Sequence, residues 1–169
     1  ARFADEMEID VLEAIEVANT QPFCDIHDPG AGVGGHCIPF YPYFLTETLE
    51  TEAPVLRTAR SVNESMPAFA ADKLLDGLVE EDVDPETATI AVLGLTYRPG
   101  VNETRASPAF PIIDRLDEAG VSVIAVDPVL GDIPESDVTT ASVDRLPEFD
   151  LDGALLVTAH DEFDRIDWS

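Results

Sequence analysis

The sequence predicts an α/β fold, in which a helical segment is followed by an open parallel sheet with flanking helices. In the first half, apolar residues recur every three to four positions, which is the period of an amphipathic helix. In the second half, short apolar runs alternate with a helical pattern, as βαβ units require. We place the boundary in the acidic stretch 80–86. The two parts are then a helical segment over residues 1–80 and a sheet domain over residues 86–169, in which three strands are evident.

The helical part begins with one helix predicted over residues 1–18. Phe3, Met7, Val11, Ile15 and Ala18 would share one face of it. Residues 20–39 contain three prolines and no apolar periodicity, which predicts a long loop. A short helix is expected at residues 42–45.

A longer helix is predicted to start at Pro54, because proline suits the first turn of a helix. Pro67 removes a backbone donor, so this helix should be kinked or split there. One apolar stripe runs along it, and we interpret the stripe as core packing. The stripe consists of Val55, Ala59, Val62, Met66, Ala70 and Leu74.

The second part contains three apolar runs that are typical of buried parallel strands, at residues 89–95, 121–126 and 154–158. Ser107 and Pro108 fit the N-cap and first position of a helix that runs to residue 119, where Gly120 stops it. Between residues 131 and 152 the signal for secondary structure is weak.

Acidic residues dominate the composition. Asp and Glu total 35 against 9 Lys and Arg, a net charge of −26. This balance argues against nucleic-acid binding, which needs a basic face. Spread acidity with almost no lysine is typical of proteins from salt-loving archaea.

No apolar run approaches the roughly 20 residues that span a bilayer. Two cysteines are too few for a disulfide scaffold. We therefore expect a reduced, cytoplasmic protein.

Chemistry is expected first in the glycine-rich stretch from Gly30 to Pro39, which contains His36 and Cys37. Glycines let a backbone pass close to a ligand. Backbone amides and a neighbouring imidazole both favour the nucleophilic thiolate of a cysteine. Cys37 is therefore either a reactive nucleophile or a small buried residue that closes a tight turn.

A second candidate site is the connection between the strand at 89–95 and the following helix. It leaves the carboxyl end of a parallel strand, where ligands of such sheets bind, and the helix N-terminus suits an anion. Arg98 and Arg105 lie in it, and arginine matches a phosphate with two parallel hydrogen bonds. The alternative is that both arginines pair with local carboxylates.

These two stretches resemble one family. Gly32-Val33-Gly34-Gly35-His36-Cys37-Ile38-Pro39 is similar to the catalytic-cysteine signature of the UDP-glucose/GDP-mannose dehydrogenase family, the nucleotide-sugar 6-dehydrogenases. Its His-Cys-Ile-Pro form resembles the branch that oxidises UDP-N-acetylhexosamines such as UDP-N-acetylmannosamine. The segment from Tyr97-Arg98 to Arg105-Ala106-Ser107-Pro108 resembles the carboxy-terminal signature of the family, with arginine at position 98 where the family has lysine.

The resemblance implies NAD as cofactor, a UDP-sugar as substrate and a Rossmann-like sheet domain. It implies Cys37 as the catalytic nucleophile and Arg105 on the cofactor side. It also implies a homodimer through the helix at 54–80. The residues that it implies for substrate binding are Gly32, Gly34, Gly35, His36, Tyr97 and Arg98.

Two departures from the family pattern affect function. Tyr41 stands where the family has Asp four residues after the cysteine, and tyrosine is a poor base at neutral pH. The family's amino-terminal NAD domain is not in this sequence, so we expect no turnover from this chain alone. Two further readings stay open, a UDP-sugar-binding and dimerisation module without catalysis, or a homologue that has lost oxidation.

The remaining candidates are assigned structural roles. Cys24, His27, His36 and Cys37 lack the paired spacing of a zinc site, so no metal is expected. Asp127 ends a strand where ribose binds in some α/β folds, but no glycine fingerprint precedes it, so a turn role is favoured. His160 is expected to be a satisfied surface histidine.

Overall fold

The computed structural model describes residues 1–50, 52–131 and 138–166. The chain forms two compact units, residues 1–30 and residues 31–169, which we describe separately.

The first unit contains two helices rather than the one predicted over residues 1–18. These are α1 (Arg2–Glu6) and α2 (Val11–Asn19). The chain leaves helical geometry at Glu8, which has a φ of 56°. Asp10 then starts a new helix, because its carboxylate accepts hydrogen bonds from the backbone N–H groups of Leu12 and Glu13 at 2.8 and 3.2 Å. The prediction of a single helix was therefore wrong.

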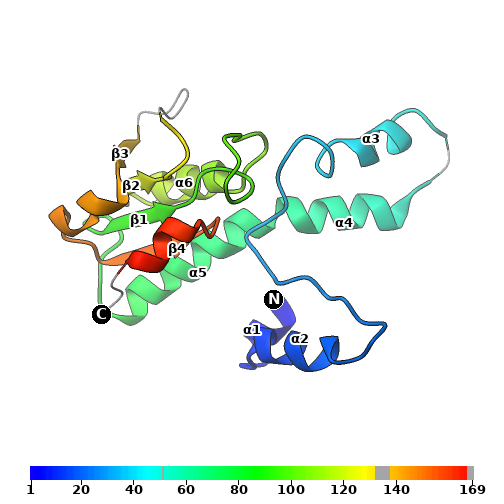
Figure 1. Cartoon of the computed structure of the whole chain (residues 1–169), viewed down its shortest axis with the longest axis horizontal. Coiled ribbons are helices and arrows are strands. Elements are labelled where there is room, and N and C mark those ends of the chain that lie inside the picture. Colours follow the sequence, from blue (N-terminus) through cyan, green and yellow to red (C-terminus); the bar gives the residue numbers. More distant parts are fainter. Residues whose placement is uncertain (51, 132–137, 167–169) are drawn as a thin grey trace. The chain divides into compact units, whose positions relative to one another are not determined.

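The second unit begins with the end of the predicted long loop, from residue 31, and the predicted short helix, α3 (Tyr41–Thr46). The next helix is split, as expected from Pro67, into α4 (Pro54–Glu64) and α5 (Met66–Glu80). The break lies at Ser65, and Figure 1 shows α5 sloping away from the line of α4. The side chain of Arg57 on α4 donates to the carbonyl oxygen of Thr46 at 2.6 Å, which ties α3 to α4.

The apolar stripe is buried along α5 but exposed along α4. On α5, Ala70 and Leu74 pack against the core, as predicted. On α4, Val55 is 80% exposed and Val62 is 49% exposed. Core packing was therefore the wrong interpretation for α4, whose apolar side chains face outward in this chain.

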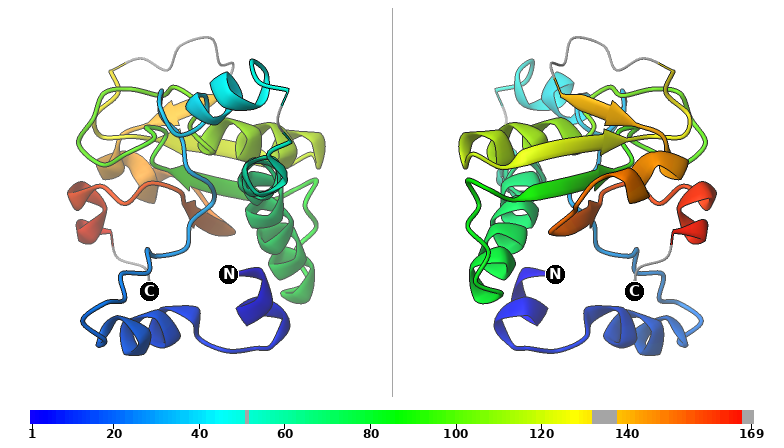
Figure 2. Two further views of the ribbon diagram at one scale, coloured as in Figure 1. Left: turned by 90° about the vertical axis from the view of Figure 1, so that its right-hand side faces the viewer. Right: turned by 90° about the vertical axis from the view of Figure 1, so that its left-hand side faces the viewer.

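A four-stranded parallel sheet organises the rest of the second unit (Figures 1 and 2). The three predicted strands are confirmed within two residues at each end. Sequence patterns missed β3, which is short and lies at the edge of the sheet. The strands lie in the order β3 (Thr139–Ala141), β2 (Ser122–Val126), β1 (Thr89–Leu93) and β4 (Gly153–Leu156).

Both faces of the sheet are covered, and successive residues of β1 point to opposite sides. Ile90 and Val92 join the core formed with α5 and α6 (Ala109–Glu118). Ala91 and Leu93 join a smaller core with residues from two 3-10 helices, η1 (Val143–Glu148) and η2 (Asp161–Arg165). Figure 2 shows the long helices on one side of the sheet and the short ones on the other.

Helix α5 shares its core with the sheet. Ala71 and Leu78 are buried in the same cluster as the first strand. The division that we placed at 80–86 therefore stays a prediction about domain organisation, and it does not separate two cores in this chain. None of the helices in the described ranges has the length and apolarity that crossing a bilayer would need.

Candidate functional site

The two stretches singled out in the sequence lie against each other, although about 60 residues separate them. The backbone N–H of Gly35 donates to the carbonyl oxygen of Arg105 at 2.8 Å. A methyl group on Gly34 would lie 2.6 Å from the carbonyl oxygen of Ala106 and 2.8 Å from Cβ of Tyr97. Glycine is thus required at position 34 by the close approach of the two loops.

Asn63, near the end of α4, holds the same glycine-rich loop from the other side. Its Oδ1 accepts from the backbone N–H of Val33 at 2.8 Å, and its Nδ2 donates to the carbonyl oxygen of Val33 at 3.3 Å. Gly32 next to it has a φ of 134°, which favours glycine. The loop is therefore fixed between α4 and the connection that precedes α6.

A cavity of about 440 Å³ opens where these elements meet. Arg60 lines it with a side chain that is only 10% exposed. Its Nη2 lies 3.3 Å from Oε1 of Glu64, which also accepts a 2.6 Å hydrogen bond from the Tyr43 hydroxyl. Nε of Arg60 is buried and has no hydrogen-bond partner among the described residues. The cavity is also lined by Gly32, Val33, Asn63, Ala106, Ser107 and Pro108.

Cys37 lies between this loop and α3. It is a free, half-buried thiol, and its carbonyl oxygen accepts from the backbone N–H groups of Phe40 and Tyr41 at 3.1 and 2.8 Å. A hydrogen bond with the Cys37 side chain, followed by the charge of that side chain, raises the pKa of Tyr41. Tyr41 therefore stays protonated at neutral pH, where it can donate a hydrogen bond to sulfur but cannot act as a base. His36 is exposed.

Arg98 and Arg105 are both exposed, on the connection between β1 and α6. Neither guanidinium is within 4 Å of a carboxylate in the part of the chain that the structure describes. The alternative in which they pair with local carboxylates is therefore not what the structure shows. The helix begins one residue later than predicted, because α6 starts at Ala109 and Pro108, rather than Ser107, is at the N-cap position. Oγ of Ser107 still accepts from the backbone N–H of Ala109 at 3.3 Å.

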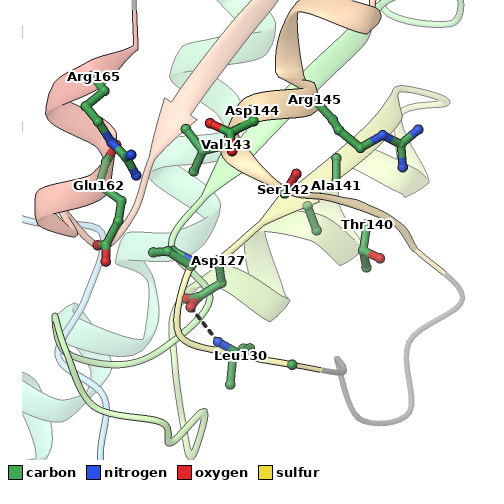
Figure 3. A pocket seen from close by; sticks show the side chains of 13 residues that line it. Asp127, Leu130, Thr140, Ala141, Ser142, Val143, Asp144, Arg145, Glu162 and Arg165 are labelled. Carbon is green, nitrogen blue, oxygen red and sulfur yellow. Dashed lines mark hydrogen bonds between the residues drawn. The ribbon is translucent and has the colours of Figure 1, made fainter.

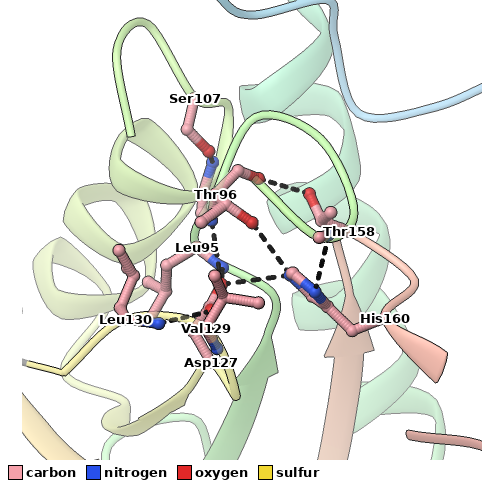
Figure 4. A network of polar contacts seen from close by, with 10 residues as sticks. Leu95, Thr96, Ser107, Asp127, Val129, Leu130, Thr158 and His160 are labelled. Carbon is pink, nitrogen blue, oxygen red and sulfur yellow. Dashed lines mark hydrogen bonds and ion pairs between the residues drawn. The ribbon is translucent and has the colours of Figure 1, made fainter. Parts of the chain in front are cut away.

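Asp127 serves a turn, as predicted. Its Oδ1 accepts from the backbone N–H groups of Val129 and Leu130, and its Oδ2 accepts from those of Leu95 and Thr96 at 2.7 and 3.0 Å (Figure 4). Burial alone would raise the pKa of this carboxyl, but the backbone N–H groups outweigh burial and lower it.

His160 is a correction to the sequence prediction, because it is buried rather than at the surface. The residue is 2% exposed, and its Nε2 lies 2.8 Å from Oγ1 of Thr96 and 3.3 Å from Oδ2 of Asp127. Figure 4 shows these side chains converging at the carboxyl ends of β1, β2 and β4. The expectation that His160 is satisfied is confirmed.

A second hollow, of about 540 Å³, lies at the carboxyl ends of β2 and β3 (Figure 3). Asp127 lines it, together with Ser142 and Arg145, but none of the predicted catalytic or binding residues does. Within the described residues, no group of three or more His, Cys, Asp or Glu side chains could hold a metal ion.

The predicted site residues are thus only partly brought together. Gly32, Gly34, Gly35, Tyr97 and Arg105 meet at the contact of the two loops. Of the predicted site residues, Gly32 alone lines the 440 Å³ cavity, and Cys37, His36 and Arg98 lie neither in that lining nor at the loop contact. Sequence patterns missed two residues of this site, Arg60 and Asn63. Arg60 shares one face of α4 with Arg57 and Glu64, so no local pattern marked it as buried, and Asn63 gave no signal either.

Comparison with known proteins agrees with this arrangement. Residues 1–65 match the model for the central domain of the UDP-glucose/GDP-mannose dehydrogenase family, and residues 91–169 match the model for its UDP binding domain. Over 168 residues, the chain is 39% identical to a UDP-N-acetyl-D-mannosamine dehydrogenase of Pyrococcus horikoshii. It is 36% identical to the enzyme of the same name from Methanocaldococcus jannaschii. The chain spans 38% and 37% of the lengths of these relatives.

Solved structures give the same result. A UDP-D-ManNAc dehydrogenase from Pyrococcus horikoshii matches 98% of this chain with a TM-score of 0.87 and 38% identity. A UDP-N-acetyl-mannosamine dehydrogenase from Staphylococcus aureus matches 98% with a TM-score of 0.80 and 32% identity. In both, the match covers 38% of the solved chain. With its two signature loops in contact and both domain models matched in order, the chain belongs to the UDP-glucose/GDP-mannose dehydrogenase family.

Proposed function

We propose that this chain is part of an NAD-dependent nucleotide-sugar 6-dehydrogenase that oxidises the C6 alcohol of a UDP-sugar to the uronic acid. UDP-N-acetylmannosamine is the favoured substrate and UDP-glucose the next. The observation that carries the proposal is the hydrogen bond from Gly35 to Arg105, because it joins the cysteine loop to the loop of the UDP binding domain. The names of the similar enzymes from Pyrococcus and Methanocaldococcus favour the mannosamine sugar.

Substrate binding is proposed at the contact of the two loops. Arg98 and Arg105 offer guanidinium groups that pair with no carboxylate among the described residues, which suits the diphosphate of a UDP-sugar. Arg60 adds a buried Nε–H that has no acceptor in the described chain. The glycines at 32, 34 and 35 allow the backbone to approach the sugar closely. Tyr97 holds this loop in place by packing against Gly35.

Cys37 is proposed to carry the reaction. Its thiolate adds to the C6 aldehyde formed in the first oxidation, giving a thiohemiacetal. Loss of a second hydride turns this into a thioester, which water hydrolyses to the uronic acid and free thiol. Covalent capture prevents the aldehyde from escaping. Because Tyr41 is protonated, its role is to donate a hydrogen bond to the sulfur, and the base that activates water is another group.

NAD would accept both hydrides when bound. In this chain only Arg105 is proposed to contact it. The sheet itself does not fit a dinucleotide, because no Gly-x-Gly-x-x-Gly motif follows β1. Asp127, which stands where a ribose-binding acid would, already accepts four backbone hydrogen bonds. We therefore assign no step of NAD binding to the residues of the sheet.

The oligomeric state, the adaptation to salt and the cellular location of the enzyme are also proposals. The exposed apolar residues Val55 and Val62 on α4 support a homodimer through the helices at 54–80. The net charge of −26 supports a protein adapted to high salt. A cytoplasmic location fits two free cysteines.

The test is NADH formation by the full-length protein in molar KCl, with UDP-N-acetylmannosamine, UDP-glucose and UDP-N-acetylgalactosamine as substrates. We expect Cys37→Ser to abolish NADH formation beyond the aldehyde stage. Cys24→Ser is the matched control, because Cys24 is the other cysteine of this sequence, and it should leave the rate unchanged.

The outcomes separate the alternatives. Unchanged NADH formation in Cys37→Ser would refute the covalent mechanism. If the wild-type protein binds UDP but oxidises none of the three sugars, the chain is a binding module or a homologue that has lost oxidation. If it neither binds UDP nor forms NADH, the proposed function fails.

A further inference from the structure

A buried polar cluster at the carboxyl edge of the sheet has no part in the chemistry proposed above. It consists of Thr96, Asp127, Thr158 and His160, which come from the ends of three strands (Figure 4). The side chains of His160 and Asp127 are each 1% exposed. Burying charged and polar groups is costly unless all of them are paired, so a cluster of this kind needs a compensating role or full satisfaction.

The cluster fixes the start of the connection that carries Arg98 and Arg105. Asp127 accepts from the backbone N–H groups of Leu95 and Thr96. The Thr158 hydroxyl donates to the carbonyl oxygen of Thr96 at 2.6 Å. Both backbone polar groups of Thr96 are thus held before the chain turns outward toward Arg98.

His160 also reaches further along the same connection. The backbone N–H of Gly100 donates to Nδ1 of His160 at 3.4 Å. Nδ1 is therefore the unprotonated nitrogen, and Nε2 carries the proton that it shares between Thr96 and Asp127. An edge-to-face contact with Phe163, with ring centroids 5.6 Å apart, keeps the imidazole in this orientation. One ring thus connects the base of the loop, through Nε2, to its middle, through Nδ1.

We propose that His160 is a positioning residue, which holds residues 97–107 in the conformation that presents Arg98 and Arg105 to the nucleotide sugar. This inference rests on the proposed function for its ligand, but its effect on the loop does not depend on that function. The far end of the same loop contacts the cysteine loop, because the backbone N–H of Gly35 donates to the carbonyl oxygen of Arg105. The conformation of residues 97–107 therefore also affects the loop that carries Cys37.

Two substitutions distinguish the contact made by Nδ1 of His160 from the contacts made by Nε2. In His160→Asn, Oδ1 takes the place of Nδ1, so the acceptor for Gly100 is kept and the link to Asp127 is lost. In His160→Gln, the terminal amide takes the place of Nε2, so the link to Asp127 is kept and the acceptor for Gly100 is lost. A merely structural role for the histidine predicts the larger loss for Asn, whereas positioning of the loop predicts the larger loss for Gln.

The first measurement is amide hydrogen exchange of the full-length protein without ligand. We expect His160→Gln to speed exchange in residues 97–107 by about tenfold, while His160→Asn stays within about twofold of the wild type. The second is calorimetric titration with UDP, where we expect about tenfold weaker binding for His160→Gln only. Ile90→Val is the control, because it removes one methyl group from a core cluster that does not contain Phe163. It should lower the melting temperature and leave the loop unchanged.

Equal exchange in the two histidine variants, or wild-type exchange in His160→Gln, would overturn the proposal. It also fails if Ile90→Val loosens the loop as much, since loop order would then follow overall stability. If the wild-type protein does not bind UDP, the proposed function fails, and the exchange measurement alone still decides whether His160 orders the loop.

Discussion

The substitution Asp127→Asn tests whether the hydrogen bonds of this carboxylate stabilise the start of the loop between β1 and α6. The carboxylate has two oxygens, each of which accepts two backbone N–H groups. Asparagine has one oxygen, and its amide group would face the other two N–H groups as a competing donor. Each buried N–H left without an acceptor costs about 1–3 kcal/mol, so the expected loss is about 2–6 kcal/mol. The free energy of unfolding of a typical protein is only about 5–15 kcal/mol, so this loss would be a large part of it.

The assay is urea unfolding in molar KCl, followed by circular dichroism. Asp76→Asn is the matched control, because Asp76 is exposed on α5, and its substitution should change the free energy of unfolding by less than about 0.5 kcal/mol. A loss below about 1 kcal/mol for Asp127→Asn, with an unchanged slope against urea, would refute the account of the four hydrogen bonds.

The same carboxylate predicts how stability depends on pH. Its pKa is lowered from 3.8 in the folded state, because the backbone N–H groups that stabilise the charge outweigh burial. A group with a lowered pKa stabilises the fold fully above its unfolded pKa and loses this contribution as pH falls through the folded value. The difference in stability between the wild type and Asp127→Asn should therefore be constant near neutral pH and shrink below pH 3.8. A difference that grows on acidification would contradict this assignment.

Three further predictions concern the loops and the surface. Gly34→Ala should weaken UDP binding, because the new methyl group would lie 2.6 Å from a carbonyl oxygen of the facing loop, whereas Gly30→Ala meets no atom within 4 Å and should bind normally. Tyr41→Phe should slow alkylation of Cys37 by iodoacetamide several-fold, because a hydrogen bond to sulfur is lost, and Tyr43→Phe should not. Dialysis into dilute buffer should lower the helical circular dichroism signal, since 35 acidic residues then repel with little screening, and an unchanged spectrum would count against adaptation to salt.

The sequence predicted the elements that are buried. Strands β1 and β2 stood out because a parallel strand covered on both faces is a continuous apolar run. Strand β4 is also an apolar run, although it lies at the sheet edge and Leu156 is 50% exposed. The missed strand, β3, reads Thr139-Thr140-Ala141 and is exposed at the sheet edge, so burial left no pattern in it. The break between α1 and α2 was missed because the apolar period continues across it. Asp10 followed by Glu13 was the signal of a new helix start.

The site was predictable where glycines and signature residues lie close together in sequence. The residues that hold it were not. His160 is 64 positions from Thr96, and only the sheet order, with β1 between β2 and β4, brings their strand ends together. Burial of His160 is a consequence of this convergence, since no local pattern distinguishes it from a surface histidine.

The distribution of arginine contacts supports the view that the loop between β1 and α6 awaits an anion. In a chain with 35 carboxylates, chance alone would place an acid near most guanidinium groups. Arg98 and Arg105 have no such partner within the described residues, although they share one loop. We propose that a ligand phosphate neutralises both arginines, and that the buried cluster of Thr96, Asp127, Thr158 and His160 holds the loop in place for it. By contrast, carboxylates pair with Arg57, Arg60, Arg115 and Arg145.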